Sequence, residues 1–399
     1  MKVSTDKNAV KELLSRSVDT VYPTRAALER ELLSGRRLRV YLGIDPTGAH
    51  LHLGHATNLL LLRRFQDLGH ESILLIGDFT ARIGDPTDKL AARQPLTTEQ
   101  IESNLKTFKK QAAKIVRFGG ENPARIEFNS TWHDKMTFGE LIKLAQHFTV
   151  QQIEERDMFE ARRKEGKPIG LHEFLYPLSQ GYDSVALDVD VEIGGTDQTF
   201  NMLAGRTLMK ALKQKEKFVM TTKLLVDPAT GKKIMNKSEG GLVNLDDLSN
   251  DMFGKVMALA DSAIFPVAEF STTMPIDEVR ALDKEKNPRD AKLRVAHEVV
   301  KTYHSAKEAD AAREEWVRVF SKKGAPEEAL ALAVPRSLSL IELVLASGIK
   351  SKSEARRLIA GNAVSINGAA HSDPNEVLPV KGGETLKIGK HRFFTLEVK

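Results

Sequence analysis

One stretch near the N-terminus constrains the fold more than any other, because its pattern is that of a strand, a tight loop and a helix start. A mostly apolar run, Leu38–Ile44, ends at Asp45-Pro46, and proline cannot donate to a strand ladder. A polar loop with a glycine follows, and His52-Leu53-Gly54-His55 then opens a long apolar segment, Ala56–Leu68. A strand that leads into a helix N-terminus in this way is typical of α/β proteins that bind phosphates, because unpaired backbone N–H groups and the helix dipole favour negative charge.

Two histidines, His52 and His55, flank Gly54 in this motif. A lone histidine at a helix start usually does no more than cap the helix. Two of them around a glycine favour a functional site instead, because their N–H groups can stabilise charge that develops on a phosphate. The motif is therefore the first candidate for a catalytic site.

Length and composition limit the class of protein. A chain of 399 residues is too long for one ordinary core, so two or three domains are expected. Its hydrophobic content of 41% and charged content of 28% are typical of soluble globular proteins, and no apolar run approaches the ~20 residues that cross a bilayer. No secretory signal is visible, and the absence of cysteine excludes disulfides, thiolate catalysis and cysteine-bound zinc. These features predict a cytoplasmic protein without a membrane partner, and the net charge of +5 is a weak indication of a polyanionic partner.

The first block of the chain, to about residue 230, alternates strand and helix patterns. Strands are expected at Ser72–Ile76, at Arg125–Phe128 and at Val185–Ile193, where apolar residues recur with a period of two. Helices are expected over Thr98–Arg117 and Thr137–Ala161. This alternation predicts a parallel sheet covered by helices, with the ligand site at the carboxyl ends of the strands.

Two further blocks follow. Residues 243–322 have helical periodicity and predict a small all-helical domain, with helices over Asp247–Leu259, Pro275–Leu282, Ala291–Ser305 and Ala306–Phe320. An alanine-rich connector leads to the last block, 337–399, which has two short helical patterns, Leu340–Ser347 and Lys352–Ala360. There Asn367-Gly368 predicts a hairpin turn, and two more short strands are expected after it.

Two polar segments of the first block could bind a small substrate. Asp85 lies in a loop with Lys89 and Arg93 beyond it; this is also an ordinary turn composition. Tyr176, Gln180 and Asp183 recur at i, i+4 and i+7, so on a helix they share one face. A tyrosine, an amide and a carboxylate on one face could hold a small zwitterion, although a solvated face is an equal alternative.

Two other segments are suited to a nucleotide. Gly194-Gly195-Thr196-Asp197-Gln198 follows a strand pattern, so a ligand can approach the backbone closely and Asp197 can accept from ribose hydroxyls; a simple turn is the alternative. The basic loop 232–241 could clamp a leaving pyrophosphate, although most lysine-rich loops are only solvated.

Read together, these segments resemble the class I aminoacyl-tRNA synthetases. The His-x-Gly-His motif resembles their HIGH signature, and Ile234–Ser238 resembles their KMSKS loop. Within the class, Tyr41 with Tyr176-x-x-x-Gln180-x-x-Asp183 and Gly-Gly-Thr-Asp-Gln resembles the tyrosyl-tRNA synthetases over essentially the whole chain. The resemblance implies a homodimer and an α/β fold. The chain would begin with a Rossmann-type parallel-sheet catalytic domain over 1–230 and a mobile KMSKS-like loop over 231–242. An α-helical anticodon-side domain over 243–322, a linker over 323–336 and a small α+β RNA-binding domain over 337–399 would follow, the last of which resembles a ribosomal-protein module.

The resemblance also implies a reaction. L-tyrosine would be activated by ATP with Mg²⁺ to tyrosyl-adenylate and pyrophosphate, and the tyrosyl group would pass to the 3′-terminal adenosine of a tyrosine tRNA. Positioning and charge stabilisation suffice for both steps, so neither a tightly bound cofactor nor a metal held by the protein is expected.

The family's residue roles transfer to matching positions of this sequence. Tyr41 and Asp183 would bind the substrate phenol, and Asp85, Tyr176 and Gln180 its ammonium group, with Gln198 near its carboxylate. The adenylate would be lined by Gly43, Asp45, Gly195, Asp197 and Gln198. The ATP phosphates would face Thr47, His52, Gly54 and His55, and pyrophosphate would be held by Lys89, Arg93, Lys237 and Ser238. The first lysine of KMSKS falls on Ile234 here and its serine on Asn236, so Lys233 is the candidate substitute.

A basic cluster in the last block is a candidate RNA contact. Lys350, Lys352, Arg356 and Arg357 surround a helix start in which Glu354 is the only acid. A solvated helix face would explain them by composition alone. Beside a hairpin and a synthetase-like body they favour RNA binding through phosphates and shape.

Three other functions remain open. A tryptophanyl-tRNA synthetase is close, but the Tyr41 and Asp183 pair and the last block argue against it. A nucleotidyltransferase such as a pantothenate-forming ligase can carry a similar histidine motif but needs no RNA-side domains. An RNA-binding protein with a decayed catalytic body is disfavoured because the residues expected at the site are intact, namely His52, His55, Asp85, Asp183 and Gln198.

Overall fold

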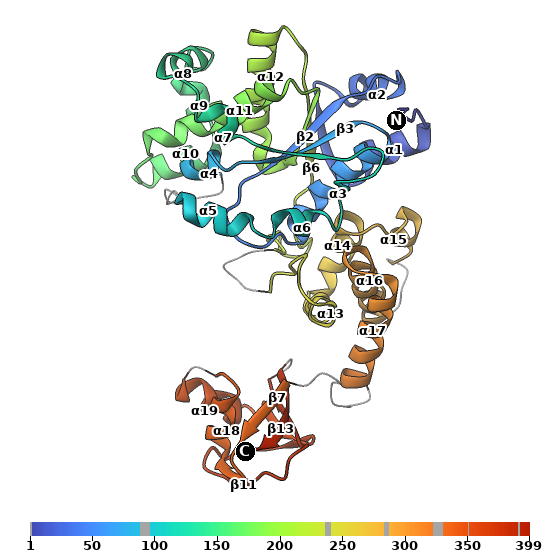
Figure 1. Cartoon of the computed structure of the whole chain (residues 1–399), viewed down its shortest axis with the longest axis vertical. Coiled ribbons are helices and arrows are strands. Elements are labelled where there is room, and N and C mark those ends of the chain that lie inside the picture. Colours follow the sequence, from blue (N-terminus) through green and yellow to red (C-terminus); the bar gives the residue numbers. More distant parts are fainter. Residues whose placement is uncertain are drawn as a thin grey trace.

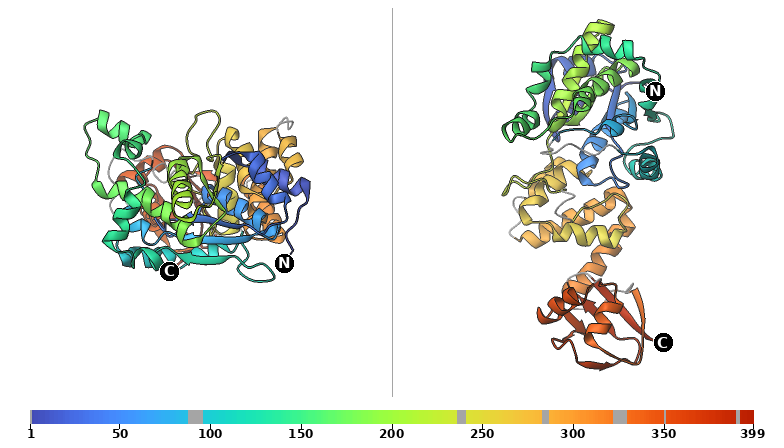
Figure 2. Two further views of the ribbon diagram at one scale, coloured as in Figure 1. Left: turned by 90° about the horizontal axis from the view of Figure 1, so that it is seen from above. Right: turned by 90° about the vertical axis from the view of Figure 1, so that its left-hand side faces the viewer.

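The computed structural model describes residues 2–87, 96–235, 241–282, 287–321, 330–349, 351–389 and 392–399. An α/β part, a group of helices and a small strand-rich part follow one another along the long axis, with the two termini toward opposite ends (Figures 1 and 2). Among the helices in the described ranges, none is both long and apolar enough to cross a membrane.

A six-stranded sheet forms the centre of the first part, in the order β1-β6-β5-β2-β3-β4. The pairs from β6 to β4 are all parallel, as predicted, whereas β1 is an antiparallel edge strand that was not foreseen. The chain runs from β2 outward through β3 to β4 and then returns to the other side of β2 with β5. The strand order therefore reverses between β2 and β5, the place where open α/β sheets bind ligands. The strands are β1 Val18–Tyr22, β2 Arg39–Ile44, β3 Glu71–Ile76, β4 Arg125–Phe128, β5 Val191–Gly195 and β6 Phe218–Thr222.

Helices cover both faces of this sheet. Alternate residues of β2 face opposite sides of the sheet. Val40 and Leu42 belong to the large core that includes α3, whereas Tyr41 packs with Leu187 at the end of α11 and with Val189 just after it. The segment that feeds β2 into α3 has the predicted strand–loop–helix form. The helices of this part are α1 Lys7–Ser15, α2 Arg25–Leu33, α3 Leu53–Asp67, α4 Thr80–Ile83, α5 Thr98–Leu105, α6 Phe108–Ala112, α7 Ser130–His133, α8 Phe138–Ala145, α9 Val150–Glu154, α10 Asp157–Lys164, α11 Leu175–Leu187 and α12 Thr199–Lys213, with short 3₁₀ turns η1 Leu171–Phe174 and η2 Thr196–Gln198.

The strand expected over Val185–Ile193 is wrong in its first half. Helix α11 continues to Leu187, Asp188 closes it in a left-handed conformation with φ of 49°, and β5 begins only at Val191. Helix α11 packs against both α12 and the sheet, so its last turn is buried on more than one side and mimics the alternation of a strand.

The two long helices expected over Thr98–Arg117 and Thr137–Ala161 are each divided into shorter ones. A second N-terminal cap explains the break after α8, because the Thr149 hydroxyl accepts from the Gln152 N–H while the Gln152 side chain accepts from the Thr149 N–H. Such a capping box begins a new helix rather than continuing an old one.

The following helices pack on the α/β part without a break in the hydrophobic core. They are α13 Ser249–Ala258, η3 Asp261–Ala263, α14 Ile264–Ser271, α15 Ile276–Leu282, α16 Pro288–Tyr303 and α17 Ala306–Ser321. The Ser271 hydroxyl at the end of α14 donates to the Leu53 carbonyl at the start of α3, and the Arg16 guanidinium donates to the Thr272 carbonyl. Helix α3, which carries the histidine motif, is thus bonded at its first residue to the end of α14.

The C-terminal part has a hydrophobic core of its own. Its main sheet has the order β10-β9-β12-β13-β7, with α18 Leu340–Ala346 and α19 Lys352–Ala360 beside it. Asn367 and Gly368 have φ of 49° and 84° in the turn between β9 and β10, which confirms the predicted hairpin. The expected linker 323–336 extends too far, because residues 330–334 form β7 and pair with β13. The strands are β7 Leu330–Val334, β8 Ser337–Ser339, β9 Val364–Ile366, β10 Ala369–Ala370, β11 Val377–Pro379, β12 Thr385–Ile388 and β13 Arg392–Val398.

Candidate active site

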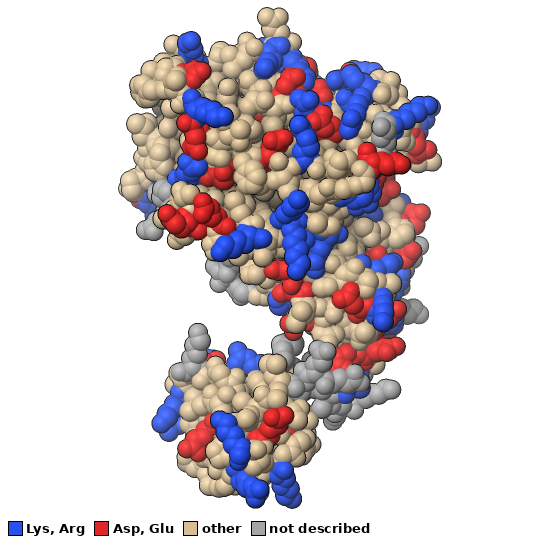
Figure 3. All heavy atoms as spheres, viewed as in Figure 1, with Lys and Arg blue, Asp and Glu red and all other residues tan. Residues whose placement is uncertain are grey.

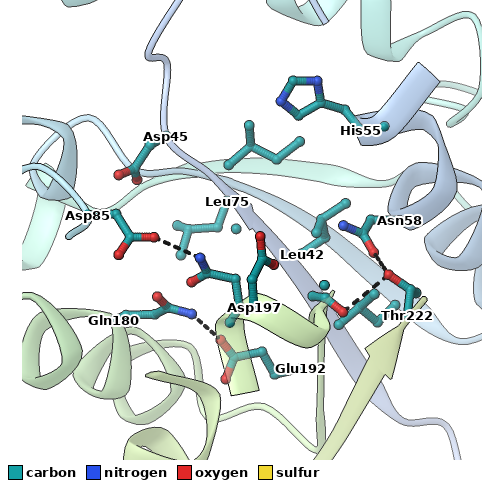
Figure 4. A pocket seen from close by; sticks show the side chains of 18 of the residues that line it. Leu42, Asp45, His55, Asn58, Leu75, Asp85, Gln180, Glu192, Asp197 and Thr222 are labelled. Atoms are coloured by element: carbon teal, nitrogen blue, oxygen red, sulfur yellow. Dashed lines mark hydrogen bonds between the residues drawn. The ribbon is translucent and has the colours of Figure 1, made fainter. Parts of the chain in front are cut away.

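A cavity of about 350 Å³ opens at the carboxyl ends of β2 and β5, at the point where the strand order reverses (Figure 4). Most of the predicted site residues line it, although they come from segments far apart in the sequence. They are Tyr41, Gly43, Asp45, Thr47, His52, Gly54, His55, Asp85, Tyr176, Gln180, Asp183, Gly195, Asp197, Gln198 and Lys233.

The other predicted residues fall into two groups. Lys89, Arg93, Lys237, Ser238 and Lys350 lie outside the described residues. Lys352, Arg356 and Arg357 are exposed on α19 in the C-terminal part, with Ala355 and Ile359 of the same helix buried behind them.

One end of the cavity has Tyr41 and Asp183. Tyr41 is fully buried in β2, and its hydroxyl lies 3.1 Å from the Ser184 hydroxyl. Burial raises the pKa of Tyr41 well above its usual value, and the nearby Glu192 and Asp183 carboxylates raise it further. This end therefore presents a neutral phenol beside a carboxylate.

Asp183 is surrounded by donors that sequence reasoning missed. Its carboxylate accepts from the Trp132 indole N–H at 2.9 Å, from His133 Nε2 at 2.8 Å and from the Asn129 amide at 3.2 Å. Burial raises the pKa of Asp183, while these hydrogen bonds favour the ionised form. These donors occupy three of about four acceptor positions of a carboxylate, so the geometry suits one more donor from a ligand.

A signal for these donors was present in the sequence. Asn129, Trp132 and His133 follow directly after β4, a strand that was predicted correctly. They therefore lie at the edge of the sheet where the ligand site was expected.

The other end of the cavity is rich in acceptors. The Gln198 amide donates to Asp85 Oδ2 at 2.7 Å, and the Tyr176 hydroxyl donates to Asp45 Oδ2 at 2.9 Å. Burial raises the pKa of Tyr176 well above its usual value, as do the Asp45 and Asp85 carboxylates. Two carboxylates and a neutral phenol oxygen form a suitable surface for a cationic group.

Arg156 lies beside Asp85 at this end of the cavity, and it was not predicted from the sequence. Its buried guanidinium donates to the Thr87 hydroxyl at 2.9 Å and lies 3.7 Å from Asp85 Oδ1. The rings of Phe159 and Phe200 lie 5.4 and 5.3 Å from its central carbon. Asp85 is thereby held between Thr87, Gln198 and Arg156.

The histidine motif caps helix α3 and also lines the cavity. His52 is the N-cap of α3: its Nδ1 accepts from the Gly54 N–H at 3.2 Å, and His55 Nδ1 accepts from the His52 N–H at 3.1 Å. A neutral imidazole whose Nδ1 accepts carries its proton on Nε2. The caps therefore set the tautomer in which Nε2 is a donor, while both residues line the cavity.

Lys233, the candidate substitute for the first lysine of the loop motif, also lies at the cavity. Its Nζ is 3.1 Å from Asp197 Oδ2. Asp197 comes from η2, directly after the Gly194-Gly195 pair that ends β5.

The sequence and structure comparisons place the chain in a family. Residues 33–321 match the tRNA synthetases class I (W and Y). The chain is 42% identical to a protein of Carboxydothermus hydrogenoformans named tyrosine–tRNA ligase, over 96% of this chain and 97% of that protein. A ligase of the same name from Thermotoga maritima is 41% identical, over 96% of each chain.

Solved structures agree in fold. The mitochondrial tyrosyl-tRNA synthetase of Aspergillus nidulans, C-terminally truncated, superposes with a TM-score of 0.67 at 24% identity, over 78% of this chain and 94% of that one. The corresponding protein of Coccidioides posadasii gives a TM-score of 0.62 at 26% identity, over 77% of this chain and 91% of that one. The chain belongs to the class I aminoacyl-tRNA synthetases, in the family of the tyrosine–tRNA ligases.

Proposed function

We propose that this protein is a tyrosine–tRNA ligase that serves protein synthesis in the cytoplasm. A carboxylate oxygen of L-tyrosine attacks the α-phosphorus of ATP, and pyrophosphate leaves. A ribose hydroxyl of the 3′-terminal adenosine of tRNA then attacks the tyrosyl carbonyl, and AMP leaves. The observation that carries the proposal is a single cavity that has the histidine motif at one wall and the Tyr41 and Asp183 pair at its end.

Tyr41 and Asp183 recognise the substrate phenol in this proposal. The support is the network on Asp183, in which Trp132, His133 and Asn129 hold the carboxylate as an acceptor for one further hydroxyl. Phenylalanine has no hydroxyl for the remaining acceptor position of Asp183, and tyrosyl-tRNA synthetases are the standard example of rejection on that basis.

Asp85, Tyr176 and Gln180 take the substrate ammonium group, and Gln198 lies near its carboxylate. All four side chains line the cavity. Asp85 and Gln180 lie on the side of it away from His55 (Figure 4). The bond from Gln198 to Asp85 links the two recognition tasks, because it fixes both side chains in one arrangement.

ATP enters as its Mg²⁺ complex, with the metal on the phosphate oxygens. His52, His55 and Thr47 face the phosphates, with Gly54 at the helix start, and the two Nε2 donors stabilise charge in the transition state. Gly43, Asp45, Gly195 and Asp197 line the adenylate, and Lys233 adds a positive charge beside it. Lys89, Arg93, Lys237 and Ser238 hold the leaving pyrophosphate.

The C-terminal part binds tRNA in this proposal. Lys and Arg side chains are spread over the face of it that Figure 3 shows, with Asp and Glu side chains among them. Lys352, Arg356 and Arg357 are exposed on α19, and Lys350 precedes that helix. Such a surface contacts RNA phosphates rather than base edges.

A homodimer is the proposed assembly. Phe138 and Ile142 lie one turn apart on α8 with 77% and 45% of their surfaces exposed. Large apolar side chains that adjoin on a surface are typical of protein–protein interfaces.

Exchange of labelled pyrophosphate into ATP, run with each standard amino acid, tests the proposed function. Exchange with tyrosine alone is expected. Exchange that requires tryptophan would favour the nearest alternative, and no exchange with any amino acid would favour an RNA-binding protein.

A further inference from the structure

A buried ion pair lies behind the wall of the cavity, and none of the roles above uses it. Glu192 of β5 and Lys217, just before β6, are 1% and 0% exposed, and the Lys217 ammonium contacts Glu192 Oε2. Lys217 also donates to the Ser184 hydroxyl at 2.8 Å and to the Met202 carbonyl at 3.0 Å. Its three protons thus each have a partner.

The surrounding backbone leaves just enough room for this ammonium group. A Cβ built on Gly205 of α12 would lie 2.4 Å from Lys217 Nζ. Burial lowers the pKa of Lys217, and the Glu192 carboxylate opposes that effect. Burying such an ion pair costs desolvation free energy, so stability alone does not explain why it is there.

Glu192 is the member of the pair that reaches the cavity. It lines the wall beside Gln180, and the Gln180 amide nitrogen donates to Glu192 Oε1 at 3.1 Å (Figure 4). An ionised carboxylate can only accept hydrogen bonds, so only the nitrogen side of the amide can face it. The Gln180 oxygen is consequently directed away from Glu192.

We propose that Lys217 is a positioning residue of the tyrosine pocket: its ammonium group holds the Glu192 carboxylate in place, and Glu192 orients the Gln180 amide so that its oxygen accepts from the substrate ammonium group. The inference rests on the proposed function and assigns a task to two residues that no recognition role includes. A neutral amide at position 192 could either accept a hydrogen bond from the Gln180 amide or donate one to it. The amide would then no longer be restricted to one orientation.

The test compares tyrosine with 3-(4-hydroxyphenyl)propionate, which keeps the phenol and the carboxylate and lacks the ammonium group. Equilibrium dissociation constants for both ligands, and KM for tyrosine and ATP in pyrophosphate exchange, are measured for the wild type, K217M and the double variant E192Q/K217M. The double variant leaves no buried charge, so it is the one expected to fold with near wild-type stability. K215M is the matched control, because Lys215 forms its ion pairs with Asp188 and Asp190 instead, both at 3.2 Å.

In the double variant we expect the dissociation constant for tyrosine to rise on the order of tenfold to a hundredfold, the effect of losing a hydrogen bond to a charged group. The constant for the propionate should rise much less, since Lys217 reaches the phenol end only indirectly, through Ser184 beside Tyr41. The KM for ATP should change little, and K215M should behave as the wild type. An unchanged affinity for tyrosine in the folded double variant would overturn the proposal. So would an equal loss for both ligands, or parallel increases in KM for tyrosine and ATP, because these indicate general damage to the cavity.

Failure of the proposed function gives a different result. In that case the wild type itself would show no exchange with tyrosine. If it used another amino acid, the same comparison of ligands with and without the ammonium group would be made with that amino acid.

Discussion

The Nε2 atom of His133 lies 2.8 Å from the Asp183 carboxylate, with both side chains almost fully buried. The His133 ring stacks on Phe79 with 4.8 Å between ring centroids, which holds the imidazole in place. An ionised Asp183 can only accept, so His133 donates from Nε2. The orientation of the proposed phenol acceptor therefore depends on an aromatic stack as well as on its own helix.

Replacing Asp183 by asparagine should separate activity from stability. We expect Asp183→Asn to lower kcat/KM for tyrosine-dependent exchange by about tenfold to a hundredfold, the cost of a hydrogen bond to a charged group. Burial raises the pKa of Asp183 in the folded protein. Because the unfolded chain, with a pKa of about 3.9 at this residue, ionises more readily, the free energy of unfolding falls as pH rises above that value. The variant cannot ionise at position 183, so its unfolding temperature should lack this part of the fall in stability with rising pH. Undiminished exchange would remove Asp183 from the phenol site.

His52→Ala or His55→Ala should lower the rate of adenylate formation about 100- to 1,000-fold, with much less effect on tyrosine affinity, because the Nε2 donors act mainly in the transition state. His52→Ala should also cost about 1 kcal/mol of stability through the lost N-cap. His52→Asn restores a good cap without an imidazole, so it should recover the stability but not the rate. His50→Ala is the control, since His50 lies in the same loop as His52 but pairs with Asp246. Equal losses of rate and affinity would indicate ground-state binding.

Gly77→Ala should disturb the cavity although Gly77 has no side chain to bind a ligand. Its Cβ would lie 1.9 Å from Asp45 Oδ1 and 2.4 Å from the Thr80 hydroxyl oxygen. Asp45 would have to move, and its bond from Tyr176 would break. We expect KM for tyrosine or ATP to rise about tenfold, the effect of one lost hydrogen bond of about 1 kcal/mol or more. Gly119→Ala is the control, because nothing lies within 4 Å of the Cβ built there. If Gly77→Ala also left both KM values unchanged, Asp45 would have no part in substrate binding.

Removing the C-terminal part should lower tRNA charging and leave adenylate formation intact. The chain should end at about residue 325, because β7 pairs with β13 and Val334 belongs to the C-terminal core. Charging of tyrosine tRNA and pyrophosphate exchange are measured side by side with the full chain. Charging at the wild-type rate would show that this part makes no productive contact with tRNA.

Phe138→Asp should weaken self-association, because it places a charge in the exposed apolar pair on α8. Sedimentation velocity at several protein concentrations should show more monomer than for the wild type. Lys143→Ala, on the same helix, is the control and should leave the distribution unchanged. A wild type that is monomeric at every concentration would contradict the homodimer.

Much of the fold could be predicted from local patterns. The strand Leu38–Ile44, the helix start at His52 and the hairpin at Asn367-Gly368 each depend on a few neighbouring residues, and each prediction was confirmed. Predictions over longer segments were wrong where packing overrode periodicity. The end of α11 alternates as a strand would, because neighbours bury more than one side of it.

The predicted site residues that line the cavity were recognised as separate motifs, and their roles remain predictions. The sequence by itself determined which chemical groups were available: the histidines, the tyrosine and aspartate of the phenol end, and the glycines at the strand ends. Only the tertiary structure decided how they are held, because Trp132, His133, Arg156 and the Glu192–Lys217 pair act through contacts between residues far apart in the chain. Such contacts depend on strand order and helix packing, which bring distant segments to one edge of the sheet and which no local pattern specifies.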